Sequence, residues 1–251
     1  MPIPIALQLY SVRDDCAQDL LGTIAKVAKM GYDGVEFAGY HGHRAEDIRM
    51  ILDDCGLKCA GTHAGYATLQ DDEIEATVEF HKVLGCDNLV VPWLPEETRN
   101  TPEATKETAD KLNAISAKLK PHGMRTGFHV HSGDMKPLSN GKSAWDLLGE
   151  YTTADFVMQY DTANGMAGGA DPVQPILDWP GRGITTHLKE WSGEHGAKVI
   201  GEGMVPWDKV FDACERVAGT QWYIVEHESY EGMSPMEAVE LCLKNLRGMG
   251  K

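Results

Sequence analysis

The feature that most constrains this fold is an alternation of short apolar runs with longer amphipathic stretches, repeated eight times along the chain. Short, mostly apolar runs are typical of parallel strands, because such strands are buried on both faces of a sheet. The runs are Ile5–Leu9, Gly34–Phe37, Lys58–Thr62, Asn88–Pro92, Arg125–Val130, Phe156–Tyr160, Ile184–Leu188 and Trp222–Val225. Strands that alternate with helices in this way predict a parallel α/β fold with right-handed crossovers.

The stretches between the runs carry the start and stop signals of helices. Thr101 and Pro102 suit the N-cap and the first position of a helix. Residues 234–237 read Ser-Pro-Met-Glu, which is a capping box with proline at the first helical position. Gly31 follows an apolar stripe and suits the left-handed position just past a helix end. These stretches are therefore predicted to be the helices between the strands.

Eight strand–helix units leave two architectures, a closed barrel or an open doubly wound sheet. An open sheet that binds dinucleotides usually has a Gly-x-Gly-x-x-Gly turn after its first strand, but residues 8–13 read Gln-Leu-Tyr-Ser-Val-Arg. The length of 251 residues also matches the roughly 250 residues of an α/β barrel. We therefore expect an α/β fold of the (β/α)8 TIM barrel type, as a single domain over residues 1–251.

The charge balance excludes some partners. The chain has 23 Lys and Arg against 38 Asp and Glu, which gives a net charge of −15. Nucleic acids and anionic membranes attract basic surfaces, so neither is an expected partner.

The six cysteines are scattered without a Cys-x-x-Cys motif, and no long apolar run is present. A reducing, cytoplasmic setting is the expectation that follows.

Polar residues stand where the apolar runs end. A barrel keeps its chemistry at the carboxyl ends of its strands, so these residues are the candidates for a functional site. In chain order they are Gln8, Glu36, His63, Trp93, His129 with His131, Asp161, His187 with Lys189, and Glu226 with Glu228. Buried carboxylates and imidazoles are costly unless they are paired or bind a metal. A single one is more often a hydrogen-bonded structural residue, but a set of them indicates a site.

The last four strands carry the most specific part of this set, because a His, an Asp, a His and a Glu could converge at the barrel mouth. Mixed imidazole and carboxylate ligands suit a divalent cation such as Mn²⁺, Co²⁺ or Zn²⁺. Lys189 lies two residues after His187 and so points the same way along its strand. It is either a substrate-facing amine or the partner of a neighbouring acid.

With these residues the chain resembles the xylose isomerase-like barrels, which are often labelled sugar phosphate isomerase/epimerase. This group is related to ketose 3-epimerases and inosose dehydratases. The resemblance extends over essentially the whole chain and predicts the same barrel. The motifs that carry it are Leu7–Arg13, Met30–Phe37, Gly61–His63, Val90–Trp93, Phe128–His131, His187–Lys189, Gly201–Gly203 and Tyr223–Glu226.

The resemblance implies one metal ion, held by Glu, Asp, His and Glu at the ends of strands five to eight. Carried over by position, these ligands fall on His129, Asp161, His187 and Glu226. The first is a departure, because histidine stands where the family pattern has glutamate. His131 is an alternative ligand, since it points the same way as His129. Mn²⁺ is the first expectation for the ion, with Co²⁺, Zn²⁺ or Mg²⁺ as alternatives.

The resemblance further implies an isomerase or epimerase that removes a proton next to a carbonyl of a small keto-sugar or polyol, through an enediolate stabilised by the metal. The implied catalytic residues are Glu226, Glu202, His131 and Lys189, with His63 or Glu228 as alternatives. The implied substrate-binding residues are Glu36, His63, Trp93, Lys189 and Glu228, and Glu202 in its Gly-Glu-Gly loop is expected to line the pocket.

Other functions stay open. If a β-leaving group departs before the proton returns, the same site is a dehydratase or a keto-glycoside lyase, and the histidine on strand five favours that outcome. Abasic-site endonucleases share this barrel, although the acidic balance argues against them, and a non-catalytic binding protein is a third class. The expected partner is a small carbohydrate, with no nucleic acid and no membrane, and homo-oligomer formation is left open.

Overall fold

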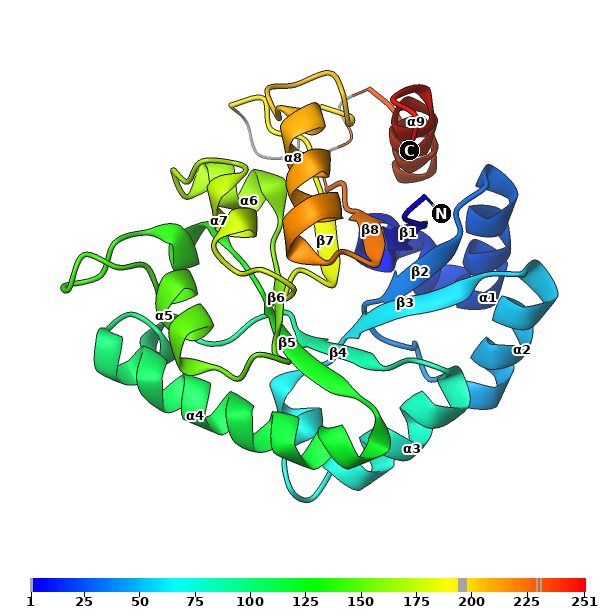
Figure 1. The fold of residues 1–251 in the computed structure, drawn as a ribbon. Coiled ribbons are helices and arrows are strands. Elements are labelled where there is room, and N and C mark those ends of the chain that lie inside the picture. The colour runs from blue at the N-terminus through cyan, green and yellow to red at the C-terminus, as the bar shows by residue number, and fades with distance from the viewer. Residues whose placement is uncertain (1, 194–197, 229, 231) are drawn as a thin grey trace.

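Eight parallel strands form one sheet in the computed structural model, which describes residues 2–193, 198–228, 230 and 232–251. The sheet order is β6-β5-β4-β3-β2-β1-β8-β7. Figure 1 shows these strands gathered at the centre with the helices around them. The strands are β1 Ile5–Gln8, β2 Gly34–Phe37, β3 Lys58–His63, β4 Asn88–Val91, β5 Arg125–His129, β6 Val157–Gln159, β7 Thr185–Leu188 and β8 Trp222–Val225. Every predicted apolar run is therefore confirmed as a strand.

The sheet closes into a barrel between β6 and β7. The amide N–H of His187 donates to the carbonyl of Tyr160 at 2.8 Å, and Asp161 and His187 form an isolated parallel bridge. At the other end of the seam, Met158 N–H donates to the carbonyl of Arg182 at 2.9 Å. The predicted TIM barrel is confirmed, and its seam joins two of the residues that the sequence analysis singled out.

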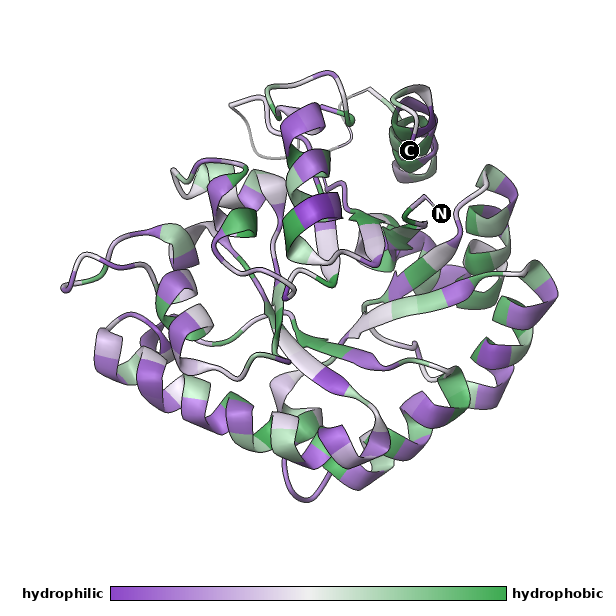
Figure 2. Ribbon diagram, viewed as in Figure 1, coloured by the Kyte–Doolittle hydropathy of each residue, from purple (hydrophilic) through white to green (hydrophobic). Residues whose placement is uncertain are grey.

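The helices lie outside the strands and turn an apolar face towards them. They are α1 Arg13–Met30, α2 Ala45–Cys55, α3 Ile74–Leu84, α4 Pro102–Leu119, α5 Ala144–Tyr151, α6 Thr162–Ala167, α7 Gln174–Leu177, α8 Trp207–Ala213 and α9 Pro235–Gly248. Figure 2 shows hydrophobic and hydrophilic residues alternating along these helices, as expected for one buried face. Within the described residues, none of the helices has the length and apolar character needed to cross a membrane.

The helix signals read from the sequence act as predicted. The Thr101 hydroxyl accepts from the Ala104 N–H at 3.1 Å at the start of α4. At the start of α9, Ser234 and Glu237 form the reciprocal capping box, in which Ser234 N–H donates to the Glu237 carboxylate at 2.8 Å. Gly31 ends α1 with φ of 97°, a left-handed conformation that glycine adopts without strain. Local hydrogen bonds thus fix where these helices begin and end.

A buried histidine outside the barrel mouth gives a pH-dependent prediction. His81 accepts from the Tyr40 hydroxyl at 2.8 Å through Nε2 and donates through Nδ1 to the Thr77 carbonyl at 2.6 Å. Burial lowers the pKa of His81 below its usual value of 6.5, so the unfolded chain takes up a proton at acid pH that the folded chain does not. Stability should therefore fall as the pH drops below about 6.5, by at most about 1.4 kcal/mol per pH unit for this group.

Urea unfolding at a series of pH values tests this, with His81→Gln as the variant and the exposed His122→Gln as its control. The His81→Gln curve should fall less steeply than the wild type below neutral pH, whereas the His122→Gln curve should keep the wild-type slope. Equal slopes in all three proteins would remove His81 as a cause.

Candidate active site

The carboxyl ends of β5 to β8 bring four possible metal ligands together. His129, Asp161, His187 and Glu226 each offer a ligand atom, and these atoms all lie within 4.8 Å of one another. All four residues are buried, and Asp161 and His187 have no exposed surface. His63, His129 and His187 form a second group of this kind. The predicted convergence of the last four strands is therefore present in the structure.

Asp161 is the residue that most needs a cation. Its Oδ1 accepts from the Asn164 N–H at 2.7 Å, which caps α6, while its buried Oδ2 has no hydrogen-bond partner in the described part of the chain. Burial raises the pKa of this carboxyl to about 6, although the charge of Lys189 acts in the opposite direction. A buried carboxylate that has an unpartnered oxygen and is grouped with two imidazoles and a second carboxylate fits a divalent ion.

His187 lies between two carboxylates. Its Nδ1 is 2.6 Å from Glu226 Oε2 and its Nε2 is 2.7 Å from Glu36 Oε2. Burial lowers its pKa, but the two carboxylates outweigh burial and raise the pKa to about 10. In the absence of a cation, His187 itself therefore carries the positive charge. If Nδ1 were a metal ligand, Glu36 would remain the acceptor that orients the ring.

His129 has the opposite protonation preference. Its Nδ1–H donates to Gln159 Oε1 at 3.0 Å, and its Nε2 accepts from Asn164 Nδ2 at 3.3 Å. Burial and the nearby charge of His187 hold its pKa well below the ordinary value, so the ring is neutral. A neutral imidazole with one nitrogen fixed as a donor is the form that binds metals. His131 lies outside this four-residue group.

A layer of polar side chains supports the four residues from inside the barrel. Glu36 accepts from Gln8 Nε2 at 2.6 Å and from Gln159 Nε2 at 2.8 Å, besides its contact with His187. Burial raises the pKa of Glu36, but His63 and His187 outweigh burial and keep it below the usual value. Glu36 is fully buried and does not line the cavity, contrary to the expectation that it binds substrate. It positions His187 instead.

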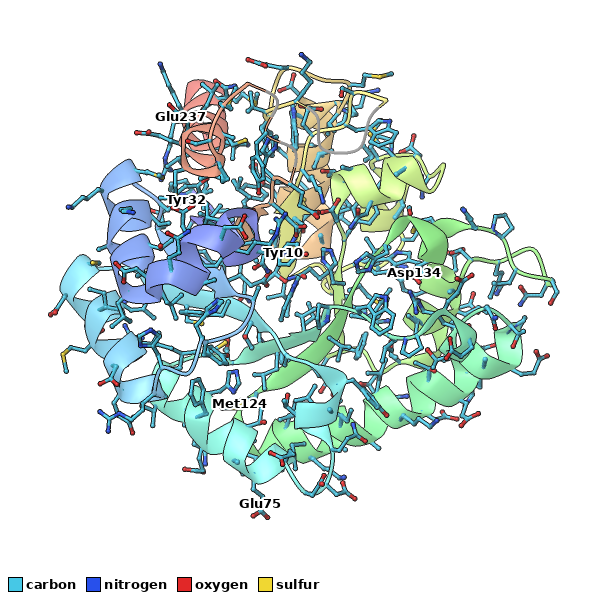
Figure 3. The ribbon with its side chains drawn as sticks, turned by 180° about the vertical axis from the view of Figure 1, so that it is seen from behind. Tyr10, Tyr32, Glu75, Met124, Asp134 and Glu237 are labelled. Atoms are coloured by element: carbon cyan, nitrogen blue, oxygen red, sulfur yellow. The ribbon has the colours of Figure 1, made fainter. Side chains whose placement is uncertain are left out.

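A cavity of about 330 Å³, which we call the mouth cavity, opens above these residues. Its volume is at the lower end of the roughly 300–1,000 Å³ typical of small-molecule sites. It is lined by Tyr10, His63, Pro92, Trp93, His129, His131, Asn164, Glu226 and Glu228. Figure 3 labels Tyr10 near the centre of the molecule and Asp134 towards the green half that contains β5 and α5. Of the predicted substrate-binding residues, His63, Trp93 and Glu228 lie in this lining.

Residues 24–247 match the family described as Xylose isomerase-like TIM barrel. The chain belongs to this family. Among solved structures of the same fold, a sugar phosphate isomerase/epimerase from Parabacteroides distasonis superposes with a TM-score of 0.85 at 22% identity, covering 98% of this chain and 94% of the other. The IolI protein with a bound zinc atom superposes with a TM-score of 0.75 at 16% identity, over 97% and 96% of the two chains.

Two curated relatives are similar in sequence over part of their length. An inosose dehydratase of Geobacillus kaustophilus is 23% identical over 189 residues, which is 66% of this chain and 60% of the relative. A 2-oxo-tetronate isomerase of Haemophilus influenzae is 28% identical over 138 residues, which is 48% of this chain and 54% of the relative. The chain therefore matches less than two thirds of the length of either relative.

Two residues implied by the family resemblance lie elsewhere than expected. Lys189 is fully buried, and its Nζ donates to Glu226 Oε1 at 3.2 Å and to the Glu228 carboxylate. Burial lowers its pKa, but Glu226 and the neighbouring acids outweigh burial and raise it above the usual value. Lys189 is thus the ion-pair partner of two acids, which is the second of its two sequence interpretations, and it does not face the cavity.

Glu202 is exposed and is not among the described residues that line the mouth cavity. The reason is Glu190, a buried carboxylate that the sequence analysis missed. It accepts from the N–H groups of Gly201 at 2.8 Å and Val205 at 3.0 Å, and from Trp207 Nε1 at 2.9 Å. These bonds hold the Gly-Glu-Gly loop around the Glu190 carboxylate, so the expectation that Glu202 lines the pocket is corrected.

Gln159 and Asn164 also belong to the site and were not predicted. Gln159 donates to Glu36 and accepts from His63 Nε2 at 2.9 Å, so it connects three strand ends. The sequence signal for this role was an amide side chain within the otherwise apolar run 156–160. In the structure this residue, Gln159, is fully buried. Asn164 gave no comparable signal, because it follows the strand on a helix.

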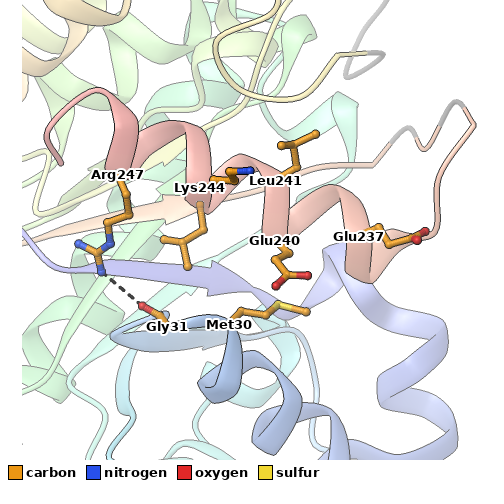
Figure 4. Close-up of a pocket in the computed structure, with 8 residues that line it drawn as sticks. Met30, Gly31, Glu237, Glu240, Leu241, Lys244 and Arg247 are labelled. Carbon is orange, nitrogen blue, oxygen red and sulfur yellow. Dashed lines mark hydrogen bonds between the residues drawn. The ribbon is translucent and has the colours of Figure 1, made fainter.

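A larger cavity of about 590 Å³ lies between the end of α1 and α9. Figure 4 shows Met30, Gly31, Glu240 and Arg247 around it, with the Arg247 guanidinium donating to the Gly31 carbonyl at 3.3 Å. It contains neither of the two histidine-containing ligand groups found in the described residues. The size of a cavity is therefore a poorer guide to the active site here than its chemistry.

Proposed function

We propose that this protein is a divalent-metal-dependent isomerase or epimerase of a small keto-sugar or polyol, which acts by removing a proton next to a carbonyl. The observation that carries this proposal is the convergence of His129, Asp161, His187 and Glu226 below a cavity that also contains His131. The relatives named as a 2-oxo-tetronate isomerase and an inosose dehydratase support it.

The donor set fits one divalent cation, with His129, Asp161, His187 and Glu226 as the residues that would hold it. When bound, such an ion polarises substrate oxygens as a Lewis acid and so acidifies the neighbouring C–H. Two imidazoles with two carboxylates favour Mn²⁺, Co²⁺ or Zn²⁺ over Mg²⁺, which prefers oxygen ligands and water. Zinc in the similar IolI structure supports a transition-type ion, and Mn²⁺ is our first expectation.

Two side chains are suited to handle the proton. Burial raises the pKa of Glu226, but Lys189 and His187 outweigh burial and hold it well below the usual value, so Glu226 is an ionised carboxylate in the lining of the mouth cavity. His131 has its pKa lowered by burial and lines the cavity, and its buried Nδ1 has no hydrogen-bond partner within the described residues. A neutral imidazole with an available nitrogen can accept or return a proton. His63 is a poorer candidate, because its Nε2–H donates to Gln159 and Glu36.

Incubation with a panel of ketoses in D₂O tests the proposal. Mass spectrometry and NMR should find deuterium at the carbon next to the carbonyl in an isomerised or epimerised product. His131→Asn should slow the exchange by about 10²–10⁴-fold, because a positioned acid–base group contributes that much. The same variant should keep the wild-type metal content. A product formed without solvent deuterium would contradict proton removal, and an active His131→Asn enzyme would remove His131 from the mechanism.

A lyase is the second candidate, and His129 favours it. Histidine at this strand end leaves the ligand set with one negative charge fewer than the family pattern, so a bound cation would withdraw electrons more strongly. The inosose dehydratase relative supports the same outcome. In the D₂O experiment a lyase would release water or an alcohol and leave an unsaturated carbonyl product, which its ultraviolet absorbance distinguishes from an isomer.

The cellular setting and partners stay predictions. We propose a cytoplasmic enzyme, because its six cysteines are scattered without a Cys-x-x-Cys motif. Its net charge of −15 supports a small carbohydrate as the partner rather than nucleic acid or a membrane. Homo-oligomer formation stays open.

A further inference from the structure

A second cavity of about 440 Å³ adjoins the mouth cavity, and Trp93 lines both. We call it the side cavity. Its walls come from the segments that follow β4 and β5, which also supply Pro92 and His131 to the mouth cavity. Besides Trp93, its lining includes Glu96, Asn100, Ser132, Lys136 and Leu138. The two cavities therefore adjoin at Trp93.

The side cavity is built on a buried ion pair. Arg99 and Asp134, whose side chains are 8% and 1% exposed, pair across the two segments and lie in the cavity lining. Arg99 also donates to the carbonyls of Leu94 and Pro95, the latter at 3.0 Å, and Asp134 accepts from the His131 N–H at 2.8 Å. The same pair thus fixes the wall of the side cavity and the backbone of His131. A pocket held in this way is formed before a ligand binds.

The chemistry of the side cavity suits a neutral, polyhydroxylated group. Trp93 lies at the boundary and is 59% exposed, and its indole offers a flat apolar face against which the C–H face of a sugar ring can pack. Asn100, Ser132 and Glu96 offer acceptors and donors for hydroxyl groups. Asp134 offsets the charge of Arg99, whose Nε and Nη1 donate to protein oxygens, and Glu96 offsets the charge of Lys136, so the lining has no net charge. An anionic group such as phosphate finds little net attraction there.

We propose that the side cavity is a second sugar-sized subsite, so that the substrate is a neutral glycoside rather than a single sugar or a sugar phosphate. The reacting ring lies in the mouth cavity, its neutral substituent lies in the side cavity, and Trp93 packs between the two. This inference rests on the proposed function for the reacting ring, and it identifies the substrate class of that same site.

Calorimetric titration of the metal-loaded protein with three matched ketoses tests the inference. The probes are fructose, isomaltulose (fructose with a glucosyl group on its terminal hydroxyl) and the phosphate monoester of fructose at that hydroxyl. We expect isomaltulose to bind at least about tenfold more tightly than the other two, which corresponds to about 1.4 kcal/mol.

The double variant Glu96→Ala/Lys136→Ala should remove this preference and leave the affinity for fructose within about twofold. Glu97→Ala is the matched control, since Glu97 is the exposed neighbour of Glu96 outside the lining, and it should keep all wild-type affinities.

Equal affinity for fructose and isomaltulose would overturn the second subsite, and so would tighter binding of the phosphate ester. An isomaltulose preference that survives in the double variant would place the glucosyl group elsewhere and overturn it as well. Failure of the proposed function alone would give a different result. The wild type would still prefer isomaltulose and the double variant would not, but no deuterium exchange would accompany binding. Binding of none of the three probes would overturn the second subsite, whereas the proposed function is decided by deuterium exchange with the panel of ketoses.

Discussion

Asp161→Ala and His187→Ala should each abolish the metal content of the purified protein, which we expect to be about one divalent ion per chain in the wild type. Asp161 would lose the buried oxygen that has no other partner in the described residues, and His187 would lose the imidazole that joins Glu226 to Glu36. Activity should fall by at least about a hundredfold in both variants, because the Lewis acid is lost together with the proton transfer that depends on it. Inductively coupled plasma mass spectrometry after gel filtration measures the metal, and circular dichroism checks the fold.

Two controls isolate the effect of the site. Asp171 is an exposed carboxylate that accepts from the N–H groups of Val173 and Gln174, and His122 is exposed beyond α4. Asp171→Ala and His122→Ala should therefore keep the full metal content and activity. Full metal retention in both Asp161→Ala and His187→Ala would refute the ligand assignment.

Lys189→Met should cost about 3–5 kcal/mol of the free energy of unfolding, measured by urea denaturation with excess chelator. Lys189 is fully buried and donates to Glu226 and Glu228, while Asp161 lies near enough for its charge to act on the lysine pKa. Methionine fills a similar volume but leaves buried carboxylates without this cation. Removing one partner of a buried ion pair is destabilising because the remaining charge stays desolvated.

Lys142→Met is the matched control for this prediction. Lys142 pairs with Glu150 at the surface, where the two side chains are 49% and 38% exposed, so water replaces the lost partner. Its removal should change stability far less than the removal of Lys189. If the two variants unfold at the same urea concentration, Lys189 is not the structural cation that its contacts indicate.

The sequence predicted the strands and most of the strand-end residues for a physical reason. Parallel strands are buried on both faces, so each reads as an apolar run, and a polar residue at its end stands out. His129, Asp161, His187 and Glu226 were identified in this way, and the structure places all four within reach of one ion. His63, Trp93 and Glu228 were also found as strand-end residues and lie in the mouth cavity.

How deeply each strand-end side chain is buried within the barrel could not be predicted from the sequence in the same way. Glu36 and Trp93 both end apolar runs, yet Glu36 is fully buried whereas Trp93 is 59% exposed. Glu36 contacts Gln159 and His187, which are 123 and 151 residues away in sequence, so its environment depends on strands that local patterns do not relate. The position of Glu202 was likewise set by its distant partner Glu190, which holds the loop from its own strand end.

The sequence itself determined the strand-end side chains of the candidate metal site, since the alternation of apolar runs and helices predicts parallel strands whose carboxyl ends lie at one edge. The tertiary structure decided which of these side chains share a space. Closure between β6 and β7 joins Asp161 to His187, and hydrogen bonds to Glu36 and Gln159 orient the candidate ligands His187 and His129. Lys189 became the partner of two acids rather than a substrate contact for the same reason, because a buried charge is stable only where neighbouring strands bring it opposite charges.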